Sequence, residues 1–250
     1  MTRSDSLSGK VALVTGAARR IGATITRTLH AYGASVAIHY RGSAEEAVAL
    51  ADDLNSQRAD SAVSFAADLT DLPSLSTLVE NVINWRSRLD VLVNNASSFY
   101  PTPIGTITEQ QWDDLVGTNL KAPLFLSQAA LPALREGHGV IINIVDIHSQ
   151  RPLRDHTVYG PAKAGLAMLT YSLAKDLAPD VRVNGVSPGA ILWPEDGMTD
   201  DTRETILRQV PLGRAGTPED VAGAVLYLAS EASYVTGQII AIDGGRSIGW

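Results

Sequence analysis

The chain has 250 residues, with 20 basic and 27 acidic side chains, a net charge of −7 and no cysteine. This balance gives no general attraction to nucleic acid or anionic membranes, and the lack of cysteine excludes disulfides, thiolate metal sites and a cysteine nucleophile. The five histidines have no metal-binding spacing, the N-terminus is polar, and no apolar run approaches the ~18 residues of a membrane span. We expect a soluble, cytoplasmic protein without a bound metal.

Short apolar runs alternate with longer amphipathic stretches along the chain. Runs rich in Val and Ile, apolar on both faces, are typical of parallel strands covered by helices on each side. The predicted strands are Val11–Thr15, Ser35–Tyr40, Ala62–Ala67, Asp90–Asn94, Val140–Val145, Arg182–Val186 and Gln238–Ile242. The predicted helices are Arg20–Tyr32, Ala44–Arg58, Leu72–Trp85, Glu109–Arg135, Val158–Leu177 and Pro218–Ala229. This alternation predicts an α/β fold, a doubly wound sheet of about seven parallel strands in a single domain.

The turn after the first predicted strand has the features of a pyrophosphate site. Gly16 and Gly22 allow the backbone to come close to a ligand, and the start of the following helix presents N–H groups and a partial positive charge. Arg20 stands where a dinucleotide motif often has another glycine, although Arg19 and Arg20 would both suit phosphates. The alternative is an ordinary strand–turn–helix corner.

The end of the second predicted strand favours NADP(H) over NAD(H). An NAD site needs an acid about 20 residues after the glycine turn, to bind the ribose hydroxyls. Here Arg41 and Ser43 occupy that region and no acid occurs until Glu45, which suits a 2′-phosphate, although Arg41 could instead be a solvated loop residue. Asp68, after the third strand, could accept a hydrogen bond from the adenine amino group or cap the helix that follows.

Tyr159 and Lys163 lie four residues apart at the start of a predicted helix, so their side chains share one face within about 6 Å. Pro161 is compatible with a helix only in its first turn, so the helix should begin near residues 157–159. A phenol needs a pKa shift of about 3 units, roughly 4 kcal/mol, to work at neutral pH. A cation at ~4 Å supplies about that much.

These segments, taken together, resemble the short-chain dehydrogenase/reductase family. The similarity rests on Thr15-Gly16…Gly22, Asp68, Asn94-Asn95-Ala96, Asn119, Tyr159…Lys163, Pro188-Gly189 and Asp243-Gly244-Gly245, in that family's order and spacing over essentially the whole chain. The resemblance implies one Rossmann-type domain over residues 1–250, with Tyr159 as acid/base and Lys163 as its activator and ribose anchor. It also implies that Asn119 holds a proton-relay water, and that the protein is a homotetramer or homodimer.

Asp146 departs from the family pattern. The family usually has a serine 13 residues before the tyrosine, to bind a substrate carbonyl, and this chain has Asp146 there. A carboxylate beside an oxygen that becomes negative would hinder ketone reduction, whereas beside a basic ring nitrogen it could donate a proton or bind a protonated imine. Ser149 is a less suitable replacement, because it should lie past the end of the strand.

With Asp146, the stretches Thr15–Gly22, His39–Tyr40 and Asn94–Pro103 resemble the pteridine reductase branch of the family. The resemblance implies that a pterin lies between the nicotinamide and Phe99, and a flat heteroaromatic ring would gain from stacking on Phe. The loop at about residues 188–214 would close over the substrate. The substrate residues would be Arg20, Ser97, Phe99, Asp146, Tyr159 and Trp193.

The resemblance extends to a larger cofactor set and to a reaction. The cofactor residues would be Gly16, Arg19, Arg20, Ile21, Gly22, His39, Tyr40, Arg41, Ser43, Asp68, Leu69, Asn95, Ala96, Ser97, Tyr159, Lys163, Pro188 and Gly189. The expected reaction transfers a hydride from NADPH to a ring C=N of a dihydropterin, pterin or folate. A generic NADP-dependent carbonyl reductase and a non-catalytic NADP(H)-binding sensor are the alternatives.

Overall fold

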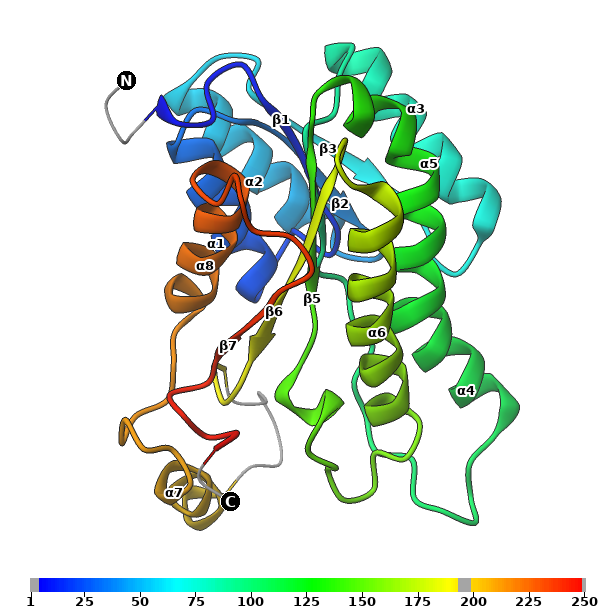
Figure 1. Cartoon of the computed structure of the whole chain (residues 1–250), viewed down its shortest axis with the longest axis vertical. Helices are drawn as coiled ribbons and strands as arrows, with labels where there is room; N and C mark the ends of the chain where they lie inside the picture. The colour runs from blue at the N-terminus through cyan, green and yellow to red at the C-terminus, as the bar shows by residue number, and fades with distance from the viewer. Residues whose placement is uncertain (1–4, 193–198, 249–250) are drawn as a thin grey trace.

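The computed structural model describes residues 5–192 and 199–248 of the chain. Its strands are β1 (Val11–Val14), β2 (Ser35–Tyr40), β3 (Ala62–Ala66), β4 (Val91–Asn94), β5 (Val140–Ile144), β6 (Arg182–Pro188) and β7 (Ile239–Ile242). The described residues form one seven-stranded parallel sheet in the order β3-β2-β1-β4-β5-β6-β7 (Figure 1). This is the Rossmann-type doubly wound arrangement that the sequence predicted.

Helices cover both faces of the sheet. They are α1 (Arg20–Ala31), α2 (Ala44–Gln57), α3 (Leu72–Arg86), α4 (Glu109–Val116), α5 (Ala122–Glu136), α6 (Tyr159–Leu177), α7 (Asp200–Arg208) and α8 (Pro218–Ser230). The helices α1, α2 and α8 pack on one face, and α3, α5 and α6 pack on the other (Figure 1). Among the described helices, none is long and apolar enough to cross a membrane.

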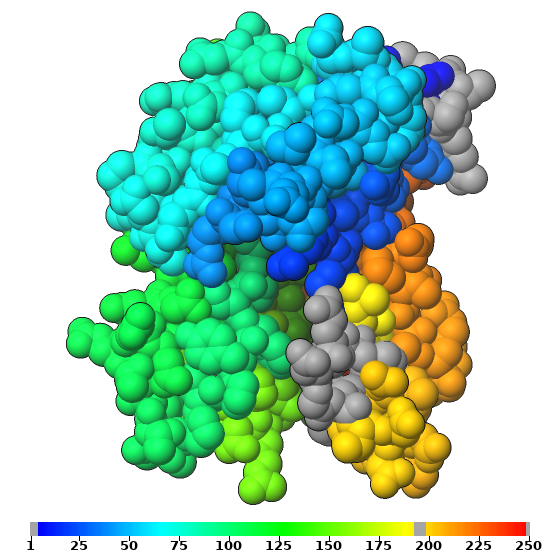
Figure 2. Space-filling view, turned by 180° about the vertical axis from the view of Figure 1, so that it is seen from behind, coloured from blue at the N-terminus to red at the C-terminus, as the bar shows by residue number. Residues whose placement is uncertain are grey.

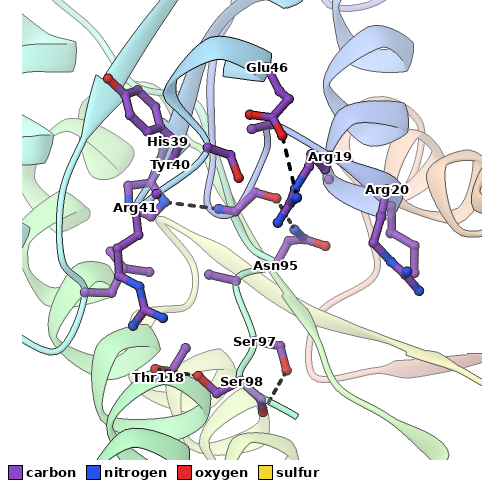
Figure 3. Close-up of a pocket in the computed structure, with 18 of the residues that line it drawn as sticks. Arg19, Arg20, His39, Tyr40, Arg41, Glu46, Asn95, Ser97, Ser98 and Thr118 are labelled. Carbon is purple, nitrogen blue, oxygen red and sulfur yellow. Dashed lines mark hydrogen bonds and ion pairs between the residues drawn. The ribbon is translucent and has the colours of Figure 1, made fainter. Parts of the chain in front are cut away.

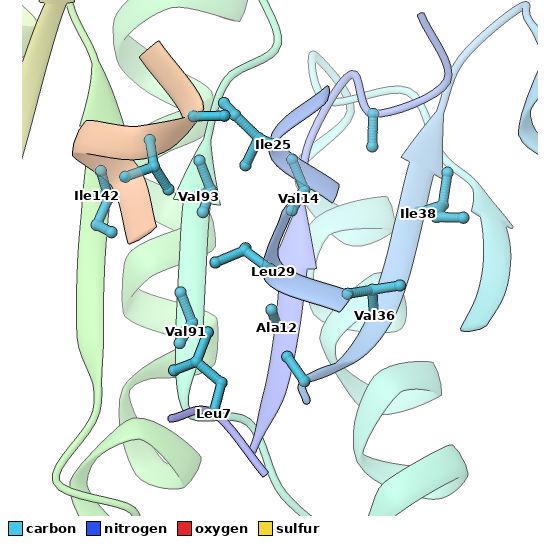
Figure 4. Close-up of a cluster of buried hydrophobic side chains, with 14 of the residues drawn as sticks. Leu7, Ala12, Val14, Ile25, Leu29, Val36, Ile38, Val91, Val93 and Ile142 are labelled. Carbon is cyan, nitrogen blue, oxygen red and sulfur yellow. The ribbon is translucent and has the colours of Figure 1, made fainter. Parts of the chain in front are cut away.

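The central strands are apolar on both faces because both faces are covered. All four residues of β1 are buried. Ala12 and Val14 join the cluster beneath α1 and α8, which Figure 4 shows, while Val11 and Leu13 join the cluster on the opposite face. Burying a Val or Leu side chain contributes about 1.5–3 kcal/mol, so these two clusters fix the position of the sheet between its helices.

The chain reverses its direction of travel across the sheet at β1, which lies between β2 and β4. In such sheets a crevice opens at the carboxyl ends of the strands where the connections diverge. Figure 2 shows the surface hollowed between the blue N-terminal segments and the green middle of the chain. Most of the residues that line this hollow follow β1, β2, β3 and β4 at this edge.

The predicted elements differ from the observed ones in two places. The stretch Glu109–Arg135, predicted as one helix, is α4, a π-helical turn η2 (Gly117–Lys121) and α5. The loop predicted at about residues 188–214 contains the helix α7, none of whose residues is buried. The other predicted boundaries agree to within two residues, and α6 begins at Tyr159, as the position of Pro161 required.

Candidate active site

The turn between β1 and α1 brings three backbone segments into close contact. A Cβ on Gly22 would lie 2.2 Å from the Gly16 carbonyl oxygen, and a Cβ on Gly16, which has a φ of +59°, would lie 2.9 Å from the Ala96 Cα. The Asn95 side chain donates to the carbonyls of Thr15 (2.8 Å) and Gly16 (3.1 Å). Glycine is therefore required at both positions, because any side chain would push the turn away from β4.

Arg20 occupies the left-handed region, with a φ of +54°. This explains why a glycine is usual at that position: a non-glycine residue there costs about 1 kcal/mol. The N-cap residue of α1, Arg19, makes no side-chain capping bond, and the first turn of the helix contains no acidic residue. The start of the helix and the Arg19 and Arg20 side chains therefore line the same pocket, as a phosphate site needs.

His39 lines the pocket, but its ring binds the protein backbone. Its Nδ1 accepts from the Gly16 N–H at 3.0 Å, and its Nε2 lies 3.1 Å from the Ala67 carbonyl oxygen, so Nε2 carries the proton. Burial lowers the pKa of His39 to about 4, and the bond to Ala67 acts in the opposite direction. A neutral imidazole thus joins the ends of β1, β2 and β3, whereas the sequence had assigned His39 to the cofactor itself.

The arginines of the pocket face carboxylates. Arg19 Nη1 lies 3.6 Å from Glu46 Oε1, and Arg41 Nη1 lies 3.8 Å from Asp114 Oδ1. Figure 3 shows Arg19 and Glu46 at the upper rim, with Arg41 pointing toward the helix that carries Thr118. Both arginine side chains are more than half exposed, so a phosphate group could replace either carboxylate at little cost.

Asp68 forms a turn of its own at the end of β3. Its Oδ1 accepts from the Thr70 N–H (2.9 Å) and the Thr70 hydroxyl (2.7 Å), and these bonds lower its pKa. The N-cap position of α3 belongs to Asp71, so Asp68 does not cap that helix. The carboxyl group lines the pocket, where an adenine amino group could reach it.

These residues surround a pocket of about 640 Å³, a size typical of cofactor sites. The residues of the predicted cofactor set that line this pocket are Gly16, Arg19, Arg20, Ile21, Gly22, His39, Tyr40, Arg41, Ser43, Asp68, Leu69, Asn95, Ala96 and Ser97. Glycine backbone, an uncapped helix start and arginines fit the phosphates of a dinucleotide, so the donor set fits the cofactor that the sequence predicted. The pocket lining does not include Tyr159, Lys163, Pro188 or Gly189.

Tyr159 and Asp146 are joined by a short hydrogen bond. The Tyr159 hydroxyl donates to Asp146 Oδ2 at 2.7 Å, and Asp146 Oδ1 accepts from the His148 N–H at 2.8 Å, which fixes the carboxylate at the start of η3 (Ile147–Ser149). Burial and the Asp146 carboxylate raise the pKa of Tyr159 well above its usual value, with Ser97 acting in the opposite direction. Tyr159 therefore holds its proton at neutral pH and points it at Asp146.

This direction corrects the sequence-based argument that Lys163 lowers the pKa of Tyr159. The Lys163 Nζ lies 5.8 Å from the centre of the Tyr159 ring, near the expected distance, but it donates to the Ile144 carbonyl at 2.9 Å. Burial lowers the pKa of Lys163 to about 8, while Asp146 raises it. Burial thus disfavours the charged ammonium, and the direction of the Tyr159 shift is set by burial and by the Asp146 carboxylate.

Asn119 lies in the π-helical turn η2 and is fully buried. Its side-chain oxygen accepts from the Ser97 hydroxyl at 2.7 Å, and its amide donates to the carbonyls of Ser98 (2.8 Å) and Leu115 (3.0 Å). The sequence analysis gave Ser97 and Asn119 separate roles, whereas in the structure a hydrogen bond connects their side chains. Asn119 thereby anchors the start of the loop that carries Phe99.

Phe99 lies at the rim of the site and is half exposed. Its ring stacks on His156 at 4.7 Å between centres and contacts Tyr159 edge to face at 4.8 Å. The aromatic surface predicted for the substrate is therefore next to the predicted acid. His156 belongs to the same cluster and was not selected from the sequence, because a single histidine in a loop carries no distinctive pattern.

The remaining predicted residues lie at the end of β6. A Cβ on Gly189 would lie 2.6 Å from the Asp243 Cβ, so Gly189 is needed for the close approach of the chain after β7. Pro188 is the last residue of β6 and pairs with Ile242. Trp193, predicted to contact the substrate, lies outside the described residues.

Sequence reasoning missed several residues of the pocket. Ala18, Gly42, Glu46, Ser98 and Thr118 also line it. Ala18, Gly42 and Ser98 lie inside motifs that the sequence analysis had used, so proximity to those motifs could have identified them. Glu46 and Thr118 come from helices, and only the packing of those helices shows which face meets the pocket.

The fold and the site define a Rossmann-type protein with a groove that suits a dinucleotide. Residues 16–247 match a family model described as enoyl-(acyl carrier protein) reductase. A crystal structure from Sinorhizobium meliloti 1021, assigned to the short-chain alcohol dehydrogenases, superposes with a TM-score of 0.91 at 32% identity, covering 96% of this chain and 97% of that chain.

Two relatives with different names are each 38% identical to the chain. Pteridine reductase 1 from Leishmania tarentolae is 38% identical over 98% of this chain and 99% of its own. A 3-oxoacyl-[acyl-carrier-protein] reductase from Staphylococcus aureus is 38% identical over 94% of this chain and 97% of its own. The chain belongs to the short-chain dehydrogenase/reductase family. These relatives are named for different substrates, so sequence identity does not define the substrate of this chain.

Proposed function

We propose that this protein is an NADPH-dependent pteridine reductase that reduces a ring C=N of a dihydropterin, pterin or folate. The observation that carries the proposal is the 2.7 Å hydrogen bond from the Tyr159 hydroxyl to Asp146 Oδ2. A carboxylate beside the acid repels an oxygen that gains negative charge, but it attracts a ring nitrogen that gains a proton. The site therefore suits reduction at C=N better than reduction of a carbonyl.

The bound cofactor would supply the hydride, and the groove at the ends of β1 and β2 would hold it. Arg41 and Ser43 would bind a 2′-phosphate, and the β1–α1 turn with Arg19 and Arg20 would bind the pyrophosphate. Lys163 would bind the ribose from within the site. The 640 Å³ pocket and the arginines around it support NADP(H).

Tyr159 delivers a proton to the ring nitrogen next to the reduced carbon, either directly or through a water bound by Asp146. Its raised pKa means that the proton is present at neutral pH, as a general acid for reduction requires. Asp146 orients the hydroxyl, and Asn119 positions Ser97 and the loop beside it. The protein thus contributes the orientation of the reacting groups and a protonated acid next to them.

Phe99 would form one wall of the substrate site by stacking on the pterin ring. Its half-exposed ring beside Tyr159 supports this role. The loop at about residues 188–214 would cover the substrate. We also propose that the protein works as a homotetramer or homodimer, as the family resemblance implies.

A generic NADP-dependent carbonyl reductase is the second candidate. It is favoured by the equal identity to the 3-oxoacyl-[acyl-carrier-protein] reductase and by the matching family model. The carboxylate of Asp146, hydrogen-bonded to Tyr159 where a carbonyl oxygen would bind, argues against it. A non-catalytic NADP(H)-binding sensor would not need the buried Tyr159, Lys163 and Asn119 side chains together.

A substrate panel tests the proposal. Purified protein should oxidise NADPH with dihydrobiopterin, and a planar antifolate should inhibit it. Asp146→Ser should lower pterin turnover by at least ~10²-fold, since a serine cannot supply or relay a proton as a carboxyl group does. Tyr159→Phe should abolish turnover and leave NADPH binding intact. Turnover of simple ketones or acetoacetyl thioesters without any pterin turnover would establish the second candidate instead.

A further inference from the structure

Asp114 on α4 contacts both the cofactor groove and the substrate loop. Its Oδ1 accepts from the Ser98 hydroxyl at 3.2 Å, and its Oδ2 accepts from the Tyr100 hydroxyl at 3.0 Å. The same Oδ1 lies 3.8 Å from Arg41 Nη1, which reaches across from the end of β2. One carboxylate therefore joins two segments that are far apart in the sequence.

The two segments have different tasks in the proposed function. Arg41 would bind the 2′-phosphate of the cofactor, and it lines the pocket together with Ser98. Ser98 and Tyr100 flank Phe99, the proposed stacking residue. Burial and the neighbouring Asp114 carboxylate raise the pKa of Tyr100, so its hydroxyl keeps the proton that it donates. Asp114 is thus held in place from the loop side while it faces Arg41.

We propose that Asp114 is a specificity-determining residue for the cofactor, because a 2′-phosphate must take Arg41 away from the Asp114 carboxylate. A cofactor without that phosphate does not compete with the Asp114 carboxylate for Arg41, so the ion pair stays intact. Asp114 therefore weakens the binding of the phosphorylated cofactor and leaves the other unaffected. In return, its bonds to Ser98 and Tyr100 hold the substrate loop against α4.

The size of the effect follows from the exposure of the pair. The Arg41 side chain is 60% exposed and that of Asp114 is 29% exposed, so the ion pair is largely screened by solvent. Because solvent screens it, an ion pair of this kind should change the affinity for NADPH by only about two- to five-fold. Asp113, the next residue on α4, is exposed and offers a matched control with the same charge.

The test compares Asp114→Asn with Asp113→Asn, and it rests on the proposed role of Arg41. Dissociation constants for NADPH and NADH are measured by fluorescence titration, without a pterin, at 0.15 M ionic strength. Asn removes the charge and keeps one oxygen acceptor; its NH2 group faces the other hydroxyl, whose oxygen can accept a hydrogen bond from it. Asp114→Asn should lower the NADPH dissociation constant by about two- to five-fold and leave that of NADH unchanged. Asp113→Asn should change neither.

A double-mutant cycle shows whether the effect passes through Arg41. In an Arg41→Gln background, Asp114→Asn should no longer change NADPH binding. The inference is overturned if both asparagine variants shift NADPH affinity equally, if Asp114→Asn weakens both nucleotides, or if the effect persists without Arg41. The binding measurements contain no pterin. If the protein does not reduce pterins, the proposed substrate is rejected, but the inference about Asp114 is unaffected.

Discussion

The Tyr159–Asp146 pair illustrates how single side chains set the chemistry of the site. The family resemblance assigned both residues to one site, and in the structure the Tyr159 hydroxyl donates to Asp146 Oδ2 at 2.7 Å. The expected balance of charges was wrong, because it counted Lys163 and left out the nearer carboxylate. The pKa of Tyr159 is raised rather than lowered, which makes the phenol a proton donor in this state.

Phe99→Ala should weaken pterin binding by about 1–3 kcal/mol, the scale of lost stacking and apolar burial. The reason is that the ring is half exposed and contacts Tyr159, so a substrate can lie on it beside the acid. Calorimetric titration of a pterin into the NADPH-saturated protein measures the change. Tyr234→Ala, which removes a fully exposed aromatic ring after α8, is the control. An unchanged affinity in Phe99→Ala would remove this residue from the substrate site.

Among the helices and strands, two departures from the sequence pattern have physical causes. The turn η2 contains a π-helical segment that shifts the helical periodicity between α4 and α5 and brings Asn119 to Ser97. A helical pattern averaged over the long stretch hides this shift. The helix α7 has no buried residue, so the apolar periodicity that identifies a helix is missing there.

The imidazole of His39 joins the ends of three strands only while it is neutral, so stability should depend on pH. Its folded pKa of about 4 lies below the unfolded value of 6.5. As the pH falls below 6.5, the unfolded chain takes up the proton first, and stability decreases until the pH reaches about 4. For one group this amounts to about 2 kcal/mol between pH 7 and pH 5. Urea unfolding at the two pH values measures it.

His39→Asn should reduce this loss between pH 7 and pH 5, since asparagine can accept from Gly16 N–H without titrating. A smaller loss will remain, because burial also lowers the pKa of His30 to about 4. The exposed His138, replaced by Asn, is the control and should retain the full dependence. An equal slope in wild type and His39→Asn would show that His39 is not the titrating group.

For the molecule as a whole, the cofactor should stabilise the fold, because the groove joins segments from β1, β2, β3 and β4. A ligand at 100 times its dissociation constant adds about 2.7 kcal/mol, which corresponds to roughly 5–11 °C for a chain of this size. Thermal unfolding with NADPH should show this increase. NADH at the same concentration should give a smaller one, since it lacks the group that Arg41 would bind. Equal shifts would argue against NADP(H) as the preferred cofactor.

The order of strands and helices was determined by the sequence alone, because a strand buried on both faces and a helix buried on one have distinct apolar periods. The glycines of the first turn and the Tyr159–Lys163 pair were also identified from local spacing, and Asp146 from the resemblance to the family. Only the tertiary structure decided the protonation of Tyr159, the backbone role of His39 and the position of Asp114 between Arg41 and Tyr100. These depend on charges, burial and bonds between segments that the chain brings together only when it folds, and no local pattern encodes them.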